Sequence, residues 1–194
     1  MTRFRRAATI AAATSVVLLG TAAAASAQTL TLRDARHDVW KTTDAGQTFT
    51  AVPNATRADV TKVRASYAGK NLVITQHFAR LDKVDSGDVY TIALRTSAHL
   101  RRLVFVQAVN VNWSGTAWMD NARKKPVACK VGEHIDYALN TVRVSVPATC
   151  LKSPRWVQFT AFDLHIASST LFYGDNPMNT QAEPKAWSPR VHKG

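Results

Sequence analysis

The stretch CKVGEHIDYALNTVRVSVPATC, residues 129–150, contains both cysteines of the chain and its clearest strand pattern. Ile135, Tyr137 and Leu139 alternate with other residues, and three alternating valines follow them. A period of two is typical of strands that bury one face. The stretch therefore predicts a pair of half-buried strands rather than a helix.

The alternation changes phase at Asn140-Thr141, which predicts a two-residue hairpin turn. This turn would pair Leu139 with Val142, Tyr137 with Val144 and Ile135 with Val146. All six side chains would then lie on one face. The opposite face would carry His134, Asp136 and Arg143, as a solvated and charge-balanced surface.

The same alternation runs through most of the chain between residues 62 and 164, in short segments that turn residues separate. Seven or eight such strands without a sustained helical stripe predict an all-β fold, a two-sheet antiparallel sandwich of the jelly-roll or Ig-like kind. We expect the sandwich domain to cover residues 28–172. Residues 173–194 contain three prolines and few apolar residues, which favours an irregular C-terminal strap.

The first 27 residues have the order of a cleaved secretory signal peptide. Three arginines come first, an apolar segment follows, and Ala25-Ser26-Ala27 forms a small-x-small cleavage pattern. The alternative is an uncleaved membrane anchor, which the short, alanine-rich span disfavours. The sequence thus predicts a secreted, extracellular protein with no transmembrane segment after cleavage, and we expect a monomer.

An exported chain with two cysteines predicts one disulfide, Cys129–Cys150. Closing a loop of this size stabilises a protein by about 3 kcal/mol in the chain-entropy model. The spacing fits neither a CxxC redox motif nor a structural zinc site. A metal pair of His134 and Asp136 is the alternative interpretation of the stretch.

Three segments resemble a group of small exported proteins of high-GC Gram-positive bacteria. They are DARHDVW (34–40), ADVTKVRASYAGKNLVITQHFARL (58–81) and HIDYALNTVRVSVPATCLKSPRWV (134–157), and the resemblance covers about residues 30–165. It implies export, a two-sheet sandwich and an Asp-rich opening turn, and it implies no activity. Many of these chains have glycine where this one has His37.

The opening turn also contains a candidate metal site. Asp34 and Asp38 flank it, and Asp59 precedes the first long strand. Ca²⁺ binds six or more oxygen ligands and accepts irregular loops, so these three carboxylates are candidate calcium ligands. The alternative is that the aspartates cap turns with their side chains. No other cofactor is predicted.

Removing the signal segment takes three arginines from the 25 basic residues and leaves 22 against 13 acidic ones, a net charge of +9. Such a surface attracts polyanions. The candidate contacts are the cluster Arg101-Arg102 and three tryptophans expected in loops, Trp40, Trp113 and Trp118, since indoles stack on sugars and cations. The alternative is that these rings cover the ends of the sandwich. The sequence disfavours nucleic-acid binding, because no long basic run appears.

No nucleophile elbow, HExxH motif or other catalytic signature appears in the chain. We therefore expect a non-enzymatic binding or envelope-associated protein, whose partner is an anionic cell-wall polymer or a glycan. The alternative is a small secreted hydrolase assembled from separate strands, around His165 and Asp163 or around His77. A purely structural role is a third hypothesis.

Overall fold

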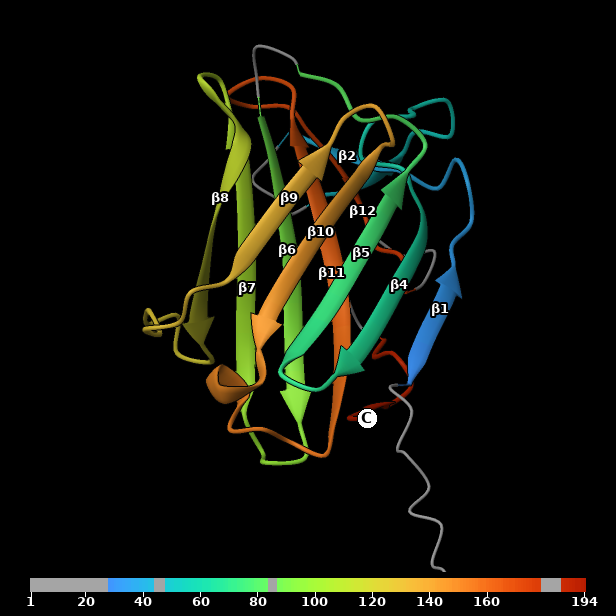
Figure 1. Cartoon of the computed structure of the whole chain (residues 1–194). Coiled ribbons are helices and arrows are strands. Elements are labelled where there is room, and N and C mark those ends of the chain that lie inside the picture. Colours follow the sequence, from blue (N-terminus) through green and yellow to red (C-terminus); the bar gives the residue numbers. More distant parts are fainter. Residues whose placement is uncertain (1–27, 44–47, 84–86, 179–185) are drawn as a thin grey trace, which may run out of the picture.

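The computed structural model describes residues 28–43, 48–83, 87–178 and 186–194. Two antiparallel sheets pack face to face in it, which confirms the predicted all-β sandwich (Figure 1). The predicted signal peptide, residues 1–27, lies outside the described residues. In the part of the chain that is described, no helix has the length and hydropathy needed to cross a membrane.

One sheet has five strands and forms the front layer in Figure 1. In spatial order its strands are β1 (Thr29–Arg33), β4 (Val60–Ala68), β5 (Asn71–Phe78), β10 (Thr141–Pro147) and β9 (Gly132–Asp136). A short 3₁₀ turn, η1 (Ala148–Leu151), follows β10. Strands β5 and β10 are neighbours although 62 residues of chain separate them, so distant segments share this layer.

The second sheet has eight strands and forms the rear layer. In spatial order they are β3 (Thr50–Ala51), β2 (Trp40–Thr42), β12 (Phe172–Asp175), β11 (Trp156–Ile166), β6 (Gly87–Thr96), β7 (Arg101–Val109) and β8 (Asn112–Asn121). The short strand β13 (Val191–His192) pairs with the beginning of β11.

The core lies between the layers and follows from the alternation in each strand. In β4, for example, Val63, Ala65 and Tyr67 are fully buried, whereas Lys62 and Arg64 point outward. Equivalent inward side chains come from every long strand, because successive residues of a strand point to opposite faces. The same alternation that buries one set of residues therefore builds a polar outer face.

The disulfide between Cys129 and Cys150 is present, with 5.8 Å between the two Cα atoms. It joins the segment before β9 to η1 after β10, and so closes the open end of this hairpin. This confirms the predicted pairing of the cysteines.

The predicted register of the hairpin is wrong. Val142 pairs with Ile135 instead of Leu139, and residues 137–140 form a longer turn. Asn140 has a positive φ of 52°, and the Leu139 N–H donates to Asp136 Oδ1, so two polar side chains build this turn. The true register differs from the expected one by an even number of residues. Ile135 therefore still faces the core, whereas Leu139 is 70% exposed.

The predicted boundary between sandwich and strap is also displaced. Residues 173–175 belong to β12 and continue the eight-stranded sheet, and Val191 in β13 is fully buried. Ser188 bonds to Phe159 of β11 through both its backbone N–H and its hydroxyl oxygen. Backbone pairing with a neighbouring strand holds this tail in place although it contains several prolines.

The two ends of the described chain meet at one end of the sandwich. Gln28 Oε1 accepts a 2.8 Å hydrogen bond from the His192 N–H, and the Gly194 N–H donates to the Tyr67 carbonyl. Strand β1 runs from this end toward the opposite one, and Asp34 follows it (Figure 1).

Candidate functional site

The three tryptophans predicted as a ligand platform lie in strands and not in loops. Trp40 begins β2 and Trp118 lies in β8, with four strands between these two in the sheet. Trp118 is 36% exposed and stacks on Phe105, with 5.1 Å between ring centroids. Trp113 packs edge-on against Tyr137, whose hydroxyl donates to the Trp113 carbonyl. The structure does not bring the three indoles onto one surface.

Arg101 and Arg102 begin β7. Arg101 is exposed and pairs with Arg95 of β6, and Arg102 Nη1 donates to the Arg101 carbonyl. The Arg95 guanidinium lies 4.6 Å from the ring centroid of Trp187, so one cation of this group is already stacked on an aromatic ring. The patch is small, and ligand contact at Arg101 and Arg102 stays a prediction.

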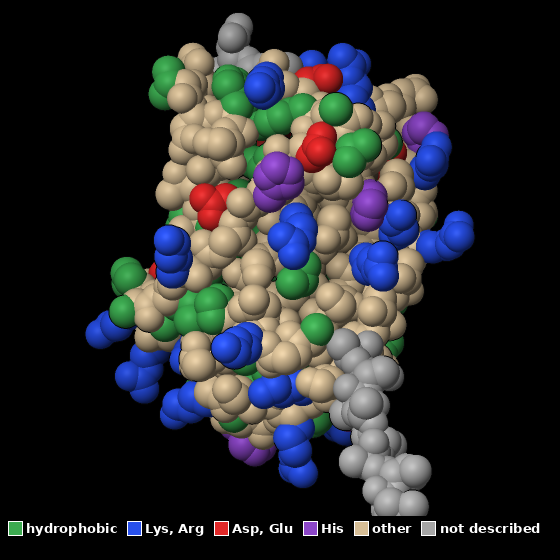
Figure 2. All heavy atoms as spheres, viewed as in Figure 1, with side chains coloured by type: hydrophobic (Ala, Val, Ile, Leu, Met, Phe, Trp, Pro, Cys, Tyr) green, Lys and Arg blue, Asp and Glu red, His purple; other side chains and the backbone are tan. Residues whose placement is uncertain are grey.

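A larger group of cations covers the outward side of the five-stranded sheet. In one cross-strand row, Arg33 pairs with Lys62, which pairs with His77. In the next row, Arg64 and Arg143 lie on either side of β5. We call these five residues the basic face. None of them forms a salt bridge with a described residue, and basic side chains far outnumber acidic ones on this side (Figure 2).

A groove of about 400 Å³ lies at one end of the basic face. Its charged and polar lining includes the basic residues Arg33, Arg36, Lys62 and His77 and one acidic residue, Asp34. Burial, together with the charges of Lys62 and Arg64, lowers the pKa of His77 below its ordinary value of 6.5. Burial is the largest cause of this shift, and the two neighbouring cations act in the same direction. The groove is therefore suited to negatively charged groups.

Sequence reasoning missed the basic face. The alternation in β4 does indicate that Lys62 and Arg64 share an outer side, and the hairpin pattern indicates the same for Arg143. Nothing in the local pattern shows that β10 lies beside β5. This long-range pairing is what joins the two groups of cations into one surface.

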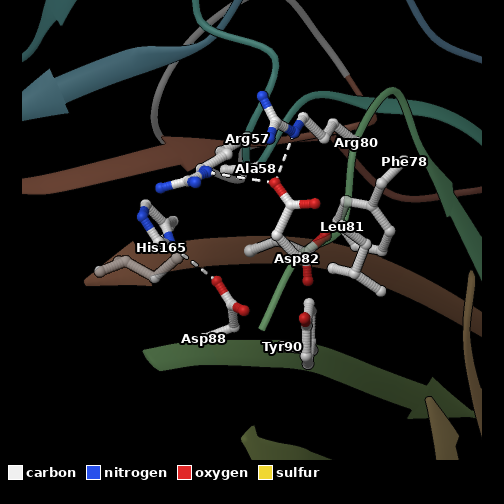
Figure 3. Close-up of a pocket in the computed structure, with 11 residues that line it drawn as sticks. Arg57, Ala58, Phe78, Arg80, Leu81, Asp82, Asp88, Tyr90 and His165 are labelled. Carbon is white, nitrogen blue, oxygen red and sulfur yellow. Dashed lines mark hydrogen bonds and ion pairs between the residues drawn. The ribbon is translucent and has the colours of Figure 1, made fainter. Parts of the chain in front are cut away.

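A second candidate site lies beneath Arg57 and Arg80 (Figure 3). Both guanidinium groups form ion pairs with Asp82, with 3.6 Å between Arg57 Nε and Asp82 Oδ2. Deeper in the pocket, His165 Nδ1 lies 2.8 Å from Asp88 Oδ1, and both side chains are buried. The enclosed space is only about 10 Å³, room for about one water molecule.

This pocket adjoins an open groove of about 450 Å³, whose lining includes His165, Tyr173, Arg57 and Arg80. A ligand here would meet two arginines and an aromatic ring. The predicted grouping of His165 with Asp163 is present only in that both are buried on the inner side of β11. Asp88, which the sequence analysis did not name, is the partner of His165. Asp163 instead accepts a hydrogen bond from Gln76.

The predicted metal residues lie near one another at the end of the sandwich where β1 ends. One carboxylate oxygen each from Asp34, Asp38 and Asp175 lies within 4.8 Å of the other two. Asp59 is fully buried beside them, and its Oδ2 accepts a hydrogen bond from the His37 N–H. Asp175 was missed because it follows the expected boundary at residue 172, and only the pairing of β12 with β11 places it here.

Burial and mutual repulsion raise the pKa values of these carboxyl groups. The pKa of Asp34 is raised to about 8, first by burial and then by Asp175 and Asp38. The pKa of Asp175 is raised to about 7, mainly by burial. Burial also raises the pKa values of Asp38 and Asp59. Among the described residues no lysine or arginine forms a salt bridge with this group, although the charges of His37 and Arg36 partly offset the shift at Asp59.

Neither a scan against protein-family models nor a search of curated proteins found a match for this chain. The candidate sites therefore rest on geometry and chemistry alone.

Proposed function

We propose that this is a secreted binding protein that holds an anionic polymer of the cell envelope on the basic face of its five-stranded sheet. The observation that carries the proposal is the pair of cross-strand rows containing Arg33, Lys62, His77, Arg64 and Arg143, without a salt-bridge partner among the described residues. Unpaired cations on one surface attract polyanions over a distance of about 8 Å at physiological ionic strength.

The shape of this surface also favours a polymer. Adjacent strands are about 4.8 Å apart, so the two rows together spread their charges over roughly 14 Å across the sheet, from Arg33 in β1 to Arg143 in β10. The groove bounded by Arg33, Arg36, Lys62 and His77 offers a deeper contact at the end of that surface. An extended chain with regularly spaced phosphates or carboxylates matches such a surface better than a compact small molecule does.

Export of the protein belongs to the proposal. The order of residues 1–27 is that of a secretory signal. The disulfide Cys129–Cys150 fits an oxidising compartment, since cytosolic proteins seldom contain stable disulfides. The resemblance of three segments to exported proteins of high-GC Gram-positive bacteria supports the same location.

The test is retention on purified anionic cell-wall polymer at low and high salt. The wild type is expected to bind at low salt and to elute as salt screens the charges. The double variant Arg64→Gln/Arg143→Gln should elute earlier. The matched control, Arg101→Gln/Arg102→Gln, removes the same charge at the site predicted from sequence and should elute close to the wild type.

Two outcomes would reject this proposal. Lack of retention of the wild type at low salt removes the binding function. Equal loss in the two double variants shows that net charge, and not the basic face, determines retention. Thermal unfolding of both variants must resemble that of the wild type, so that a folding defect is not mistaken for lost binding.

The hydrolase alternative is supported by one observation, the 2.8 Å contact between His165 Nδ1 and Asp88 Oδ1 beside an open groove. A carboxylate that orients a histidine prepares the other ring nitrogen to act as a general base. This alternative predicts release of product from wall polymer by the wild type and its loss in His165→Gln, with the exposed His192→Gln, outside both candidate sites, as a control that keeps activity. Absence of product from the wild type rejects it.

A further inference from the structure

We propose that Asp34, Asp38, Asp59 and Asp175 bind one Ca²⁺ ion that links the two sheets at one end of the sandwich. The cation binding is tested separately from the anionic ligand: none of the four aspartates belongs to the basic face, although Asp34 also lines the groove at its end. The sequence indicated three of these carboxylates, and the structure adds a fourth, Asp175, from the other end of the chain.

The spacing of the carboxylates fits one cation. Oxygens of Asp34, Asp38 and Asp175 lie within 4.8 Å of one another. Ca²⁺ binds oxygen at about 2.3–2.6 Å, so two ligands of one ion are separated by at most about 5 Å. The three oxygens therefore meet the distance condition for a common ion without any movement of the chain.

Asp59 gives independent evidence for a ligand. Its side chain is 0% exposed, and Oδ1 has no hydrogen-bond partner in the protein. Its charge raises the pKa values of Asp34, Asp38 and Asp175, so the carboxylate lies near this group, outside the set of three whose oxygens are within 4.8 Å of one another. A fully buried oxygen without a donor is costly, and a cation at the centre of the group removes that cost.

Further unpaired oxygens belong to the same group. Asp34 Oδ2 and both carboxylate oxygens of Asp38 are buried without a hydrogen-bond partner. In Asp34 and Asp59 the second oxygen accepts a backbone N–H, from Ala35 and His37 respectively. One oxygen thus fixes the orientation of the carboxylate and leaves the other available as a ligand. The unpaired oxygens are therefore already oriented as ligands before an ion binds.

The chemistry of the ligands favours Ca²⁺ over other common cations. All four side chains offer oxygen, whereas Zn²⁺ sites in proteins usually include histidine or cysteine. Asp34 and Asp38 lie in the turn after β1, whereas Asp59 lies just before β4 and Asp175 ends β12. Ca²⁺ accepts such variable geometry more readily than Mg²⁺ does. Backbone carbonyls and water complete a coordination number of six to eight in sites of this kind.

The location gives the ion a structural role. Asp34 follows β1 and Asp59 precedes β4, both in the five-stranded sheet. Asp38 precedes β2, and Asp175 ends β12, both in the eight-stranded sheet. An ion held by all four would connect the layers at the end opposite to the chain ends.

The test uses the purified protein after removal of metal with a chelator. Ca²⁺ is added in a calorimetric titration, and thermal unfolding is followed with and without Ca²⁺ and with Mg²⁺ for comparison. We expect saturable binding of one Ca²⁺ per chain, a rise of the unfolding temperature with Ca²⁺, and a smaller rise with Mg²⁺ at the same concentration.

The variant Asp38→Asn removes a ligand whose oxygens make no hydrogen bond within the protein. It should fold like the wild type and bind Ca²⁺ at least about tenfold more weakly, since affinity depends on the number of charged ligands. Asp120→Asn, in β8 and distant from the group, serves as the matched control and should bind like the wild type. No binding by the wild type, or equal affinity in the wild type and Asp38→Asn, overturns the proposal.

Discussion

The Val60 N–H donates a 2.7 Å hydrogen bond to Asp175 Oδ2, and this contact joins residues 115 positions apart in the chain. Val60 begins β4 in one sheet, and Asp175 ends β12 in the other. The contact explains why the chain after residue 172 is part of the sandwich: its carboxylate is the acceptor for a buried backbone donor of the opposite layer.

Removal of this acceptor should destabilise the protein even without metal. In the presence of a chelator, Asp175→Ala should lower the free energy of unfolding by about 1–3 kcal/mol, because a buried N–H is left without a partner. Asp175→Asn should lose less, since an amide oxygen can still accept the hydrogen bond and a buried negative charge is removed. Urea denaturation of the two variants measures the difference. Equal stability of Asp175→Ala and the wild type would contradict this role.

Two buried tyrosine hydroxyls should respond in opposite ways. Tyr67 is 0% exposed and its hydroxyl has no hydrogen-bond partner, whereas the Tyr137 hydroxyl donates to the Trp113 carbonyl at 2.9 Å. Tyr67→Phe should therefore leave stability unchanged or raise it, because an unsatisfied polar atom is removed. Tyr137→Phe should cost about 1 kcal/mol. Chemical denaturation checks both, and a larger loss in Tyr67→Phe than in Tyr137→Phe argues against this assignment of partners.

The disulfide should contribute a measurable share of stability. The double variant Cys129→Ser/Cys150→Ser should lose about 2–4 kcal/mol in free energy of unfolding, because the open hairpin has more freedom in the unfolded chain. Denaturation of the wild type with and without a reductant gives an independent measurement of the same effect. If reduction leaves the transition midpoint where it was, the bond stabilises the hairpin less than we infer.

Binding to the anionic polymer should strengthen as the pH falls. The pKa of His77 lies below 6.5, so this side chain is neutral at neutral pH and takes up a proton only under mildly acidic conditions. Lys62 and Arg64 of β4 oppose that proton, Arg143 of β10 adds positive charge nearby, and Thr141 opposite His77 is uncharged. A polyanion stabilises the protonated imidazole, so binding and proton uptake favour each other.

The variant His77→Gln should show a flatter pH dependence of retention between about pH 7.5 and 5.5. Without ligand, the lowered pKa of His77 makes the folded protein less stable at acidic pH. The unfolded chain takes up the proton at higher pH than the folded protein, so stability falls as the pH drops below about 6.5. An unchanged pH profile in His77→Gln means that other groups determine it.

The tryptophan that is most exposed should matter little for polymer binding if the basic face is the site. Trp118→Ala removes a ring on the outer face of the other sheet, where it stacks on Phe105. Retention on wall polymer should match that of the wild type. A clear loss of retention in Trp118→Ala would move the binding site to β8 and favour the contacts expected from the sequence.

The sequence was sufficient for the fold class and the disulfide because both depend on local evidence. Period-two alternation reports directly on strands with one buried face, and two cysteines leave a single possible bond. The hairpin at residues 137–140 shows where such evidence ends. The alternation predicted the correct face for Ile135. The turn, however, depends on the Asp136 side chain, which bonds to the backbone, and on the positive φ of Asn140, and the alternation contains no information on either.

The candidate sites needed long-range pairing, which a single sequence does not show. Asp34 and Asp38 were found because they flank the opening turn, and Asp59 because it precedes the first long strand, whereas Asp175 reaches them only through the pairing of β12 with β11. Arg143 joins Lys62 and Arg64 through β5 in the same way. The prolines of residues 173–194 predicted an irregular strap. Backbone hydrogen bonds from Ser188 and Val191 nevertheless hold its last part against β11.

The contact between Gln28 and His192 has a practical consequence for handling the protein. Both described termini lie at the end of the sandwich where β1 begins (Figure 1), whereas Asp34 follows the far end of that strand. A fluorophore, an immobilisation tag or a carrier domain attached after Gly194 would therefore project away from these candidate sites. Oriented capture through that terminus would leave the basic face, and the end of the sandwich that contains the four aspartates, turned toward the solution.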